Sequence, residues 1–411
     1  RWFLYLLITP TVTPEQLFKA HCDYGELLIQ QAPCSFSTYF HSTHPQGKIR
    51  LAYLSRDFFD QSAMFFLLPF FTHRNQELFE LYAYSDRDKT DDITELYRSL
   101  SDKWHDVTSL NIQEIAELIY QDHIDILIEI GAGPTGGRCF EVFACKPAPV
   151  QISRYPHTTG LTTVDYRLTD KYLDPIENET YNVENLLRLP HSVFCYCPSE
   201  SFPLVGHLPW DTNQYITFGS FNQPTKITQE VIVLWSQILL HLPSSQLVLK
   251  YIEFTSEDVK ERYWSLFEEQ SIVIERIQLL PFTSDRESHL NLYHTIDIAL
   301  DPFPFCGHTT SMEALYMGVP VVTLKGQTGF GRVTYSFLEI LGLDEFVADT
   351  PEEYFARVVK LAYNVSQLRE LRQSLRTMLL HSPLCGLESF IKDVEILYQF
   401  AYSQSCLRKQ L

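Results

Sequence analysis

The chain has 411 residues, of which 45% are hydrophobic and 20% charged, with 28 Phe and 23 Tyr. This composition is typical of a globular protein of two or three domains with large cores, and it excludes an intrinsically disordered chain. The formal net charge of −19 argues against a diffuse basic face for nucleic acid. An anionic ligand therefore requires a local device, such as a helix N-terminus supported by one or two cations.

The sequence gives no sign of a membrane span or an export signal. The apolar run from Trp2 to Ile8 is too short to cross a bilayer and lacks a cleavage pattern. The nine cysteines show no zinc-site spacing, and we interpret them as reduced thiols, with Cys195 and Cys197 on one side of a strand. We expect a soluble cytoplasmic protein. The start at Arg1 rather than Met is consistent with a fragment of a longer polypeptide.

The first predicted element is a helix that begins after Thr13 and ends near Gln31. Thr13 is expected to cap it, with Pro14 at the first helical position and Gln16 closing a capping box. A linker rich in Ser, Pro and His follows.

Strands and helices then alternate along two stretches. The first contains predicted strands at 49–54, 79–84, 124–130, 149–154 and 164–168 and helices at 62–72 and 112–121. The second contains predicted strands at 215–221, 247–252, 296–300 and 319–324 and helices around 231–242, 259–270, 284–295 and 309–317. Ser284 and Glu287 are expected to form a capping box, and Thr350 with Pro351 begins a helical tail.

Near-continuous apolar strands alternating with helices predict parallel sheets covered on both faces. We therefore expect an α/β protein with two Rossmann-like doubly wound lobes. The predicted segments are an N-terminal helix and linker (1–47), an N-terminal lobe (48–204), a C-terminal lobe (205–383) and a C-terminal helical tail (384–411).

A phosphate site is predicted where the strand ending at Asp301 is followed by a Pro/Phe loop and a helix start. That start contains Gly307, His308, Thr309 and Thr310. Ligands of open α/β sheets bind beyond the carboxyl ends of the strands, and free N–H groups at a helix start bind phosphate.

Glu313, one turn into the same helix, is a candidate partner for ribose hydroxyls. The alternative is that Thr309 is only an N-cap and Glu313 a solvated helix residue, because strand–Gly–helix turns are common in α/β folds.

Further polar residues are candidates for the same site. Asn222, Gln223 and Lys226 follow the first strand of the second lobe, and the mobile ammonium of Lys226 suits the charge of a leaving group. The alternative is a surface lysine before a helix. His289, on the helix at 284–295, and Arg332, after a Gly-rich loop, add possible phosphate contacts, although a lone histidine on a helix is more often structural.

Together these motifs resemble the catalytic region of the O-linked N-acetylglucosamine transferase and SPINDLY family over nearly the whole chain. The resembling segments are 13–21, 48–58, 146–151 with Tyr155 and Pro156, 222–226 and 301–310. The resemblance implies the metal-free, two-lobed B-type glycosyltransferase fold and inversion at the anomeric centre. It also implies a nucleotide-sugar donor as substrate, no cofactor, a protein acceptor and a tetratricopeptide-type upstream region or partner.

The resemblance also assigns roles to individual residues. Lys226 would steady the departing diphosphate, and His289 with the amides of residues 308–310 would hold the nucleotide diphosphate. Glu313 would contact the ribose, and Arg286 would lie near the base.

Three departures fall in the lobe that faces the acceptor. Gln61 stands where the family has a histidine, Gly133 replaces an aromatic residue or histidine, and the segment 153–157 reads Ser-Arg-Tyr-Pro-His. Asp122 aligns with a proposed catalytic acidic residue, the alternative being a solvated helix end. The candidate catalytic residues are therefore Lys226, Asp122 and Gln61.

The leading hypothesis is metal-independent transfer of N-acetylglucosamine from UDP-GlcNAc to Ser or Thr of a protein. His308 resembles the N-acetylglucosamine branch, whereas residues 312–318 resemble the SPINDLY branch, some of whose members use GDP-fucose. A second hypothesis is a nucleotide-sugar-binding partner with little or no turnover, which the departures favour. A third is a small-molecule or lipid-linked glycosyltransferase of the same fold.

Overall fold

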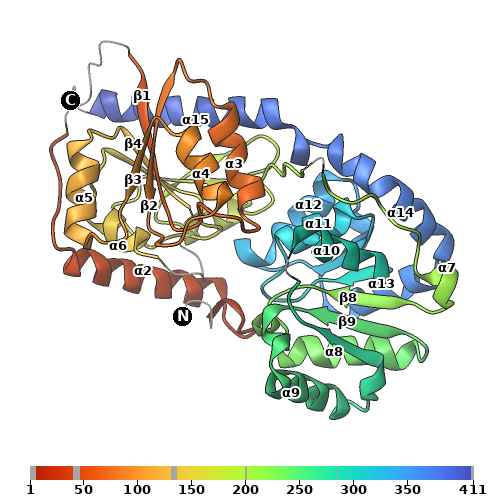
Figure 1. Cartoon of the computed structure of the whole chain (residues 1–411). Coiled ribbons are helices and arrows are strands. Elements are labelled where there is room, and N and C mark those ends of the chain that lie inside the picture. Colours follow the sequence, from red (N-terminus) through yellow and green to blue (C-terminus); the bar gives the residue numbers. More distant parts are fainter. Residues whose placement is uncertain (1–5, 40–46, 131–136, 200, 284, 409–411) are drawn as a thin grey trace. The chain divides into compact units, whose positions relative to one another are not determined.

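The computed structural model describes residues 6–39, 47–130, 137–199, 201–283 and 285–408 (Figure 1). These residues form two compact units. The first contains Val12–Cys197 and the chain from Gly386 onward, and the second contains Pro198–Cys385 with a short segment that ends at Thr11. The four segment boundaries expected from the sequence stay predictions.

The first unit is built on a seven-stranded sheet in which every pair of neighbouring strands is parallel. Its order is β3-β2-β1-β4-β5-β6-β7, so the strand order reverses between β1 and β4. The central strands β1, β4 and β5 are almost wholly buried, because helices cover both faces. The strands are β1 (Ile49–Ser55), β2 (Phe79–Ser85), β3 (Lys103–Asp106), β4 (Ile126–Glu129), β5 (Val150–Ser153), β6 (Tyr166–Thr169) and β7 (Asn185–Arg188).

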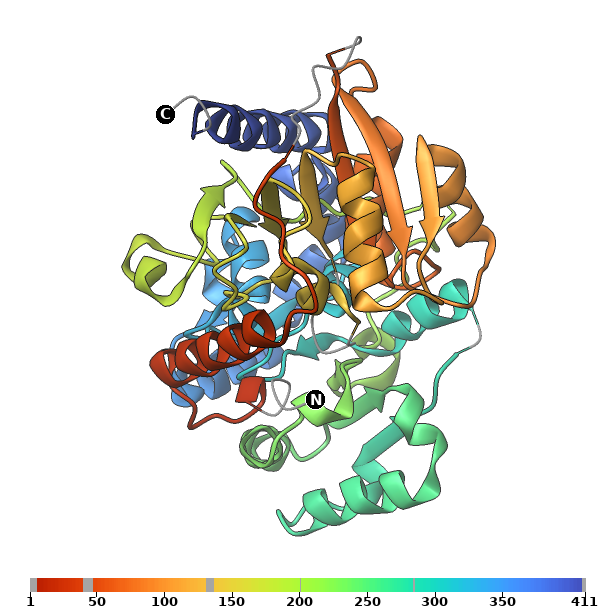
Figure 2. The ribbon, with the colours of Figure 1, turned by 90° about the vertical axis from the view of Figure 1, so that its left-hand side faces the viewer.

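The helices of the first unit include one from the end of the chain. Figure 1 and Figure 2 both show α15 running beside the first sheet, where it packs on α3 and β5. The Tyr398 ring lies 5.6 Å from that of Phe70, and its hydroxyl is 3.1 Å from the hydroxyl of Tyr53. The helices are α2 (Pro14–Gln31), α3 (Met64–His73), α4 (Asp92–Leu100), α5 (Ile112–Gln121), α6 (Cys139–Ala144) and α15 (Leu387–Arg408).

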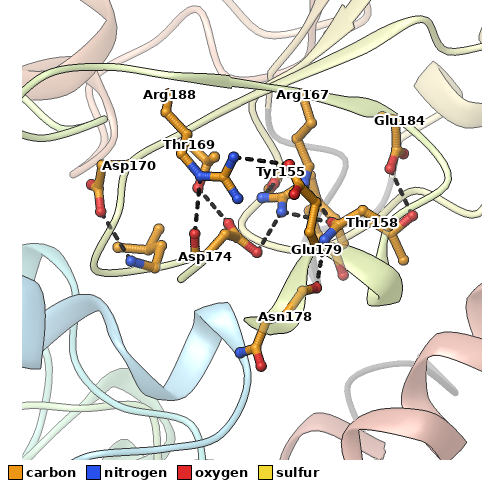
Figure 3. Close-up of polar contacts among 12 residues, drawn as sticks. Tyr155, Thr158, Arg167, Thr169, Asp170, Asp174, Asn178, Glu179, Glu184 and Arg188 are labelled. Atoms are coloured by element: carbon orange, nitrogen blue, oxygen red, sulfur yellow. Dashed lines mark hydrogen bonds and ion pairs between the residues drawn. The ribbon is translucent and has the colours of Figure 1, made fainter. Parts of the chain in front are cut away.

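A buried polar cluster joins β6 and β7 to the loops around them (Figure 3). The Arg167 side chain is fully buried and forms a 2.6 Å ion pair with Asp174. Glu184 accepts a 2.7 Å hydrogen bond from the Thr158 hydroxyl, and Asp170 accepts one of 2.9 Å from the backbone N–H of Val193. Each buried charge thus has a partner, without which its burial would strongly destabilise the fold.

The second unit contains a six-stranded parallel sheet with the order β10-β9-β8-β11-β12-β13. The strand order reverses between β8 and β11, and the carboxyl ends of strands at such a reversal are where open α/β sheets bind ligands. The strands are β8 (Thr217–Ser220), β9 (Gln246–Lys250), β10 (Ile277–Leu280), β11 (Ile298–Leu300), β12 (Val321–Leu324) and β13 (Val347–Ala348). The helices are α7 (Trp210–Asn213), α8 (Gln229–His241), α9 (Glu257–Glu268), α10 (Arg286–Asn291), α11 (Thr309–Tyr316), α12 (Val333–Ile340), α13 (Pro351–Tyr363) and α14 (Val365–Leu380).

The predicted doubly wound lobes and the main helix starts are confirmed. The Thr13 hydroxyl accepts from the Gln16 N–H at 3.3 Å, while the Gln16 side chain accepts from the Thr13 N–H at 3.0 Å, so the capping box is present. Thr350 likewise caps α13, with Pro351 at its start. Within the described residues, no helix combines the length and apolar character needed to cross a membrane.

Several local expectations were wrong. Helix α10 is capped by Asp285, whose carboxylate accepts from the Ser288 N–H at 2.7 Å, and it gives way to a 3-10 turn at Leu292. The proposed cap Ser284 lies outside the described residues. Cys195 and Cys197 lie in an irregular segment rather than in a strand, and none of the nine cysteines, all of which lie in the described residues, forms a disulfide.

Eight helices and strands were not predicted: α4, β3, α6 and β7 in the first unit, and α7, β10, α12 and β13 in the second. Strand β3 reads Lys-Trp-His-Asp and is partly exposed at the sheet edge, so it carries no apolar run to indicate a strand.

Candidate functional site

The predicted phosphate site lies at the strand reversal of the second sheet. Strand β8 leads into the segment with Asn222 and Lys226, and neighbouring strand β11 leads into the loop that begins at Asp301. Because the two strands are parallel, their carboxyl ends bring these segments together.

Lys226 ends the 3-10 turn η2 (Pro224–Lys226) and reaches across to the loop after β11. Its Nζ donates a 2.7 Å hydrogen bond to the carbonyl oxygen of Cys306 and lies 3.9 Å from the centroid of the Phe305 ring. Burial lowers the pKa of Lys226 to about 8, so its side chain is still mainly protonated at pH 7. The alternative of a solvated surface lysine is therefore wrong.

Asp301 and Gly307 shape the loop between β11 and α11. The buried Asp301 carboxylate accepts 2.6 Å hydrogen bonds from the Gly307 N–H and from the Thr323 hydroxyl. A Cβ at position 307 would lie 2.2 Å from the Ser311 Oγ and 2.9 Å from both an Asp301 oxygen and the Thr310 hydroxyl. A side chain at this position would therefore force these neighbouring side chains to shift, and glycine avoids that clash.

Helix α11 begins at Thr309, as predicted, with His308 at the N-cap position. The His308 carbonyl accepts from the N–H groups of Ser311 and Met312, both at 3.1 Å, so the amides of Thr309 and Thr310 precede the first intrahelical bonds. The Thr310 hydroxyl donates to the Asn222 side-chain oxygen at 3.0 Å. The helix start and the β8 segment are thereby linked directly.

His308 contributes no charge to this helix start at physiological pH. Desolvation, assisted by the positive charge of Lys226, lowers the pKa of His308 to about 3. Its ring stacks at 6.3 Å on that of Phe330. Because the His308 ring is neutral, Lys226 is the positive charge closest to this turn among the residues just described.

Glu313 is buried, with 2% of its side chain exposed, and two basic side chains contact it. Arg286 donates to one carboxylate oxygen at 2.9 Å, and His289 Nε2 lies 2.9 Å from the other. Burial alone would raise its pKa, but His289, Arg286 and Lys250 lower the pKa of Glu313 below its ordinary value. The alternative of a solvated helix residue is therefore wrong.

The structure adds a residue that the sequence did not indicate, Lys250 at the end of β9. Its Nζ lies 2.6 Å from His289 Nδ1 and 3.2 Å from the Thr283 hydroxyl, and burial lowers the pKa of Lys250 to about 8. Because an ammonium only donates, Nδ1 of His289 accepts and Nε2–H donates to Glu313. In the sequence, the run Leu-Val-Leu-Lys reads only as the end of a buried strand. The pairing of β9 with β8, which brings Lys250 to the site, is visible only in the structure.

Two other candidates lie at the margin of this cluster. Gln223 precedes η2, and its backbone carbonyl accepts from the Lys226 N–H at 2.9 Å. Arg332 donates to the Gly326 carbonyl at 3.3 Å and stacks over the Tyr335 ring at 4.8 Å, so its described contacts do not join it to Lys226 or Glu313.

The candidate residues of the first unit are not brought together. Gln61 lies in the loop after β1, where its side-chain oxygen accepts from the Ala63 N–H at 3.0 Å and its amide nitrogen has no partner in the described part of the chain. Asp122 ends α5 and precedes β4, and its backbone carbonyl accepts from Arg50 near the start of β1. Gln61 therefore lies at the carboxyl end of β1 and Asp122 near the opposite end.

Asp122 is held by several hydrogen bonds. Its carboxylate accepts from the Tyr84 hydroxyl at 2.8 Å and lies 2.9 Å from His105 Nε2 and 3.8 Å from the Lys103 ammonium. Burial raises its pKa, but these contacts outweigh burial and leave the pKa of Asp122 lowered. It is not a solvated helix end.

The remaining departures from the family pattern are only partly described. Gly133 lies outside the described residues. His157, from the segment 153–157, is buried and stacks on His21 of α2, with ring centroids 4.6 Å apart. Among the described residues, no group of three or more His, Cys, Asp or Glu side chains is arranged to hold a metal ion.

The sequence model of glycosyl transferase family 41 matches residues 22–208 and 207–394, which include both units and all the candidate residues above. The chain belongs to glycosyl transferase family 41. Its helix start with Lys226 in the second unit is therefore part of a glycosyltransferase fold.

Family 41 relatives extend well beyond this chain. It is 35% identical over 400 residues to a protein of Solanum lycopersicum described as probable UDP-N-acetylglucosamine–peptide N-acetylglucosaminyltransferase SPINDLY, which covers 96% of this chain and 43% of that protein. A second such relative, SEC of Arabidopsis thaliana, is 30% identical over 393 residues, covering 90% and 39%. The chain thus spans less than half the length of these relatives.

A solved structure supports the same family. The mutant O-GlcNAc transferase of Thermobaculum terrenum superposes with a TM-score of 0.91 at 31% identity, covering 99% of this chain and 77% of that one. Anabaena HepE in complex with UDP has a TM-score of 0.54 at 10% identity, which shows a shared fold alone. The two parallel α/β lobes of this chain are those of the B-type glycosyltransferase fold.

Proposed function

We propose that this family 41 chain transfers N-acetylglucosamine from UDP-GlcNAc to the hydroxyl of Ser or Thr in a protein, with inversion and without a metal ion. The observation that carries the proposal is the Lys226 ammonium, 2.7 Å from the Cys306 carbonyl and next to the start of α11. The relatives described as peptide N-acetylglucosaminyltransferases support the donor and the class of acceptor.

The donor nucleotide would bind at the carboxyl ends of β8 and β11. The amides of Thr309 and Thr310 would donate to the diphosphate, because the first N–H groups of a helix have no intrahelical acceptor and carry the positive end of its dipole. Asn222, already bonded to Thr310, and Gln223 would line the same pocket. Arg332 is a further candidate contact from the next loop.

Glu313 and the three basic side chains around it, Arg286, His289 and Lys250, would form the nucleoside end of the site. A carboxylate accepts only, so Glu313 suits the hydroxyl donors of a ribose. Arg286 and His289 lie on α10 and hold this carboxylate in place. We propose that Arg286 contacts the base, that His289 contacts the diphosphate and that Lys250 fixes the orientation of His289.

Lys226 would stabilise the leaving group. As the bond between the sugar and the diphosphate breaks, negative charge grows on the diphosphate, and a fixed ammonium interacts with it more strongly than with the ground state. The hydrogen bond to Cys306 and the Phe305 ring hold the ammonium in position before substrate binds. This arrangement supplies the neutralisation that a metal ion supplies in other transferases.

The acceptor hydroxyl must lose a proton during transfer. Gln61 cannot take it, because an amide has no basic site at neutral pH, so we propose that Gln61 orients the acceptor through its unpartnered amide nitrogen. Asp122 is the carboxylate that the resemblance offers as proton acceptor. Its bonds to Tyr84 and His105 would have to be exchanged for that role.

Two other functions remain to be tested against this one. Residues 312–318 favour a GDP-fucose donor by their resemblance to the SPINDLY branch. The replacement of a family histidine by Gln61 favours a nucleotide-sugar-binding partner with little turnover. We further propose a cytoplasmic location, which nine cysteines without a disulfide support, and a tetratricopeptide-type region or partner, since the relatives are more than twice as long.

A thermal-shift titration with UDP, GDP and their sugars, followed by intact-mass analysis of an acceptor peptide, tests the proposal. Ligand at about 100 times its Kd stabilises the folded state by roughly 2.7 kcal/mol, which is readily measured. We expect UDP and UDP-GlcNAc to raise the Tm and UDP-GlcNAc to add one N-acetylhexosamine to the peptide. A shift without any mass change would favour the binding-partner function, and no shift with either nucleotide would refute the donor site.

A further inference from the structure

A second cavity opens at the carboxyl edge of the first sheet, and the proposed function gives it no role. The loops after β1, β2 and β3 form most of it: Arg56 follows Ser55, the last residue of β1, and Asp86 follows Ser85, the last of β2. The backbone N–H of Asp86 donates to the Ser55 carbonyl at 3.0 Å, which fixes the two loops relative to each other. The eight lining residues, each polar or glycine, are Arg56, Asp86, Arg87, Asp88, Lys89, Thr108, Gly137 and Arg138.

The cavity is basic although the chain is strongly acidic. Its lining has four cations and two carboxylates, hence a net charge of +2, whereas the whole chain carries −19. Arg138 and Asp86 neutralise each other in a bidentate ion pair, and Arg138 also donates to the Val107 carbonyl at 2.9 Å. The remaining charged side chains of the lining are Arg56, Arg87, Lys89 and Asp88, so the excess positive charge lies with these residues.

These cations are held to different degrees. The Arg87 guanidinium lies 3.4 Å from the centroid of the Phe59 ring, and its Nε donates to the Lys89 carbonyl at 3.0 Å, so it is positioned in advance. Lys89 is exposed and Arg56 is half-buried. A fixed guanidinium with a mobile ammonium beside it suits carboxylate groups arriving from solvent.

We propose that this cavity is a subsite for acidic side chains, Asp or Glu, of the polypeptide acceptor. The proposal rests on the proposed function, because the loop with Arg56 also carries Gln61, which that function places toward the acceptor. The described residues that line the cavity include no apolar side chain that would hold a nucleoside or a lipid chain. In a chain of net charge −19, which repels acidic segments elsewhere, a local positive potential steers such a segment to one place.

Fluorescence anisotropy with labelled peptides tests the subsite without a donor. Three peptides of equal length carry one Ser flanked by Glu, by Gln or by Lys. The 411-residue chain is expected to bind the Glu peptide most tightly, with the preference over the Gln peptide lost at about 0.5 M NaCl because salt screens exposed charges. Equal affinity for the three peptides at low salt would overturn the proposal.

Charge reversal locates the effect. Lys89 is exposed, so Lys89→Glu is expected to leave the fold intact. We expect this variant to bind the Glu peptide roughly three- to tenfold more weakly and the Gln peptide with unchanged affinity. Arg87→Glu should act in the same direction. The matched controls are Lys360→Glu and Arg262→Glu, exposed cations on α13 and α9 of the second unit. If the controls weaken the Glu peptide as much as Lys89→Glu, net charge rather than this cavity governs binding and the proposal fails.

Two further experiments distinguish the acidic subsite from a small-anion site and from a failure of the proposed function. Inorganic phosphate that displaces the Glu peptide more effectively than chloride of equal ionic strength would assign the cavity to a small anion and contradict the proposal. In transfer assays with UDP-GlcNAc, Lys89→Glu should raise KM for the Glu peptide severalfold with kcat unchanged. If the wild type binds the Glu peptide preferentially but transfers no sugar, the proposed function is refuted and the acidic subsite stands. If it transfers sugar without any charge preference, the acidic subsite is refuted and the proposed function stands.

Discussion

The Lys226 ammonium and the Cys306 carbonyl oxygen are 2.7 Å apart, although the residues follow different strands, β8 and β11. Asp301 braces the loop that presents this carbonyl, through its 2.6 Å hydrogen bonds from the Gly307 N–H and the Thr323 hydroxyl. The ammonium is thus positioned by the loop that leads into α11. The Lys226 ammonium and the first amides of α11 therefore lie in the same part of the second unit, at the strand reversal of its sheet.

The pH dependence of transfer follows from the pKa of Lys226, which burial lowers to about 8. Only the protonated amine stabilises the leaving diphosphate, so kcat is expected to fall as pH rises through about 8. Lys226→Arg should abolish this fall in kcat at high pH, since arginine stays protonated. The variant should still turn over slowly, because a planar guanidinium does not replace a compact ammonium. Initial rates from pH 6 to 10 at saturating substrate measure this pH dependence. A wild-type kcat that stays constant to pH 10 would be inconsistent with Lys226 stabilising the leaving group.

The same lowered pKa has a consequence for stability. In the unfolded chain the lysine amine titrates near 10.4. Between about pH 8 and 10 the unfolded state binds more protons at Lys226 than the folded state, so this residue makes the free energy of unfolding rise with pH. Urea unfolding of Lys226→Met should show a smaller rise over that interval than the wild type.

Glu313→Gln is expected to destabilise the fold and weaken nucleotide binding. The substitution leaves Arg286 and His289 facing an uncharged amide in a buried site, and breaking such a pair typically costs about 3–5 kcal/mol. Urea unfolding and UDP titration measure both effects. Glu352→Gln, an exposed glutamate in the first turn of α13, is the control and should be nearly neutral.

Lowering the pH should remove the difference in stability between the wild type and Glu313→Gln. Because the folded-state pKa of Glu313 is lowered, its contribution is present above the unfolded value near 4.3 and is lost as pH falls through the folded pKa. The stability gap between wild type and Glu313→Gln should therefore narrow below about pH 4. A gap that widens on acidification would show that Glu313 is not an ionised partner of these cations.

Gly307→Ala tests the packing of the helix start. The added Cβ would lie 2.2 Å from the Ser311 Oγ, and such overpacking typically costs about 1–3 kcal/mol. Because the side chains of Ser311, Asp301 and Thr310 would have to shift at the helix start, UDP affinity should fall along with the Tm. Thr309→Ser keeps the backbone and the hydroxyl and serves as control. Unchanged Tm and UDP affinity in Gly307→Ala would mean that the close approach does not shape the site.

Local sequence signals predicted much of this architecture. Buried strands flanked by helices indicated both sheets, and Gly307 followed by two threonines indicated the start of α11, because these signals lie within a few residues of one another. The polar edge strand β3 and the true cap of α10, Asp285, gave weaker local signals.

Lys250 could not be predicted as part of the site, since it meets His289 only through the pairing of β9 with β8 and the fold of α10. For the same reason the structure, not the sequence, shows that Gln61 and Asp122 lie at different ends of the first sheet. A resemblance supplies residue roles, but contacts between distant segments depend on sheet order.

The rate of transfer by Lys226→Ala, compared with its nucleotide affinity, tests the central claim most directly. The substitution removes one hydrogen bond to Cys306 and should leave the fold intact. We predict that kcat falls by about a hundredfold to a thousandfold, the effect of removing one preorganised donor, while UDP still binds, though more weakly. Turnover at the wild-type rate in Lys226→Ala would contradict the account.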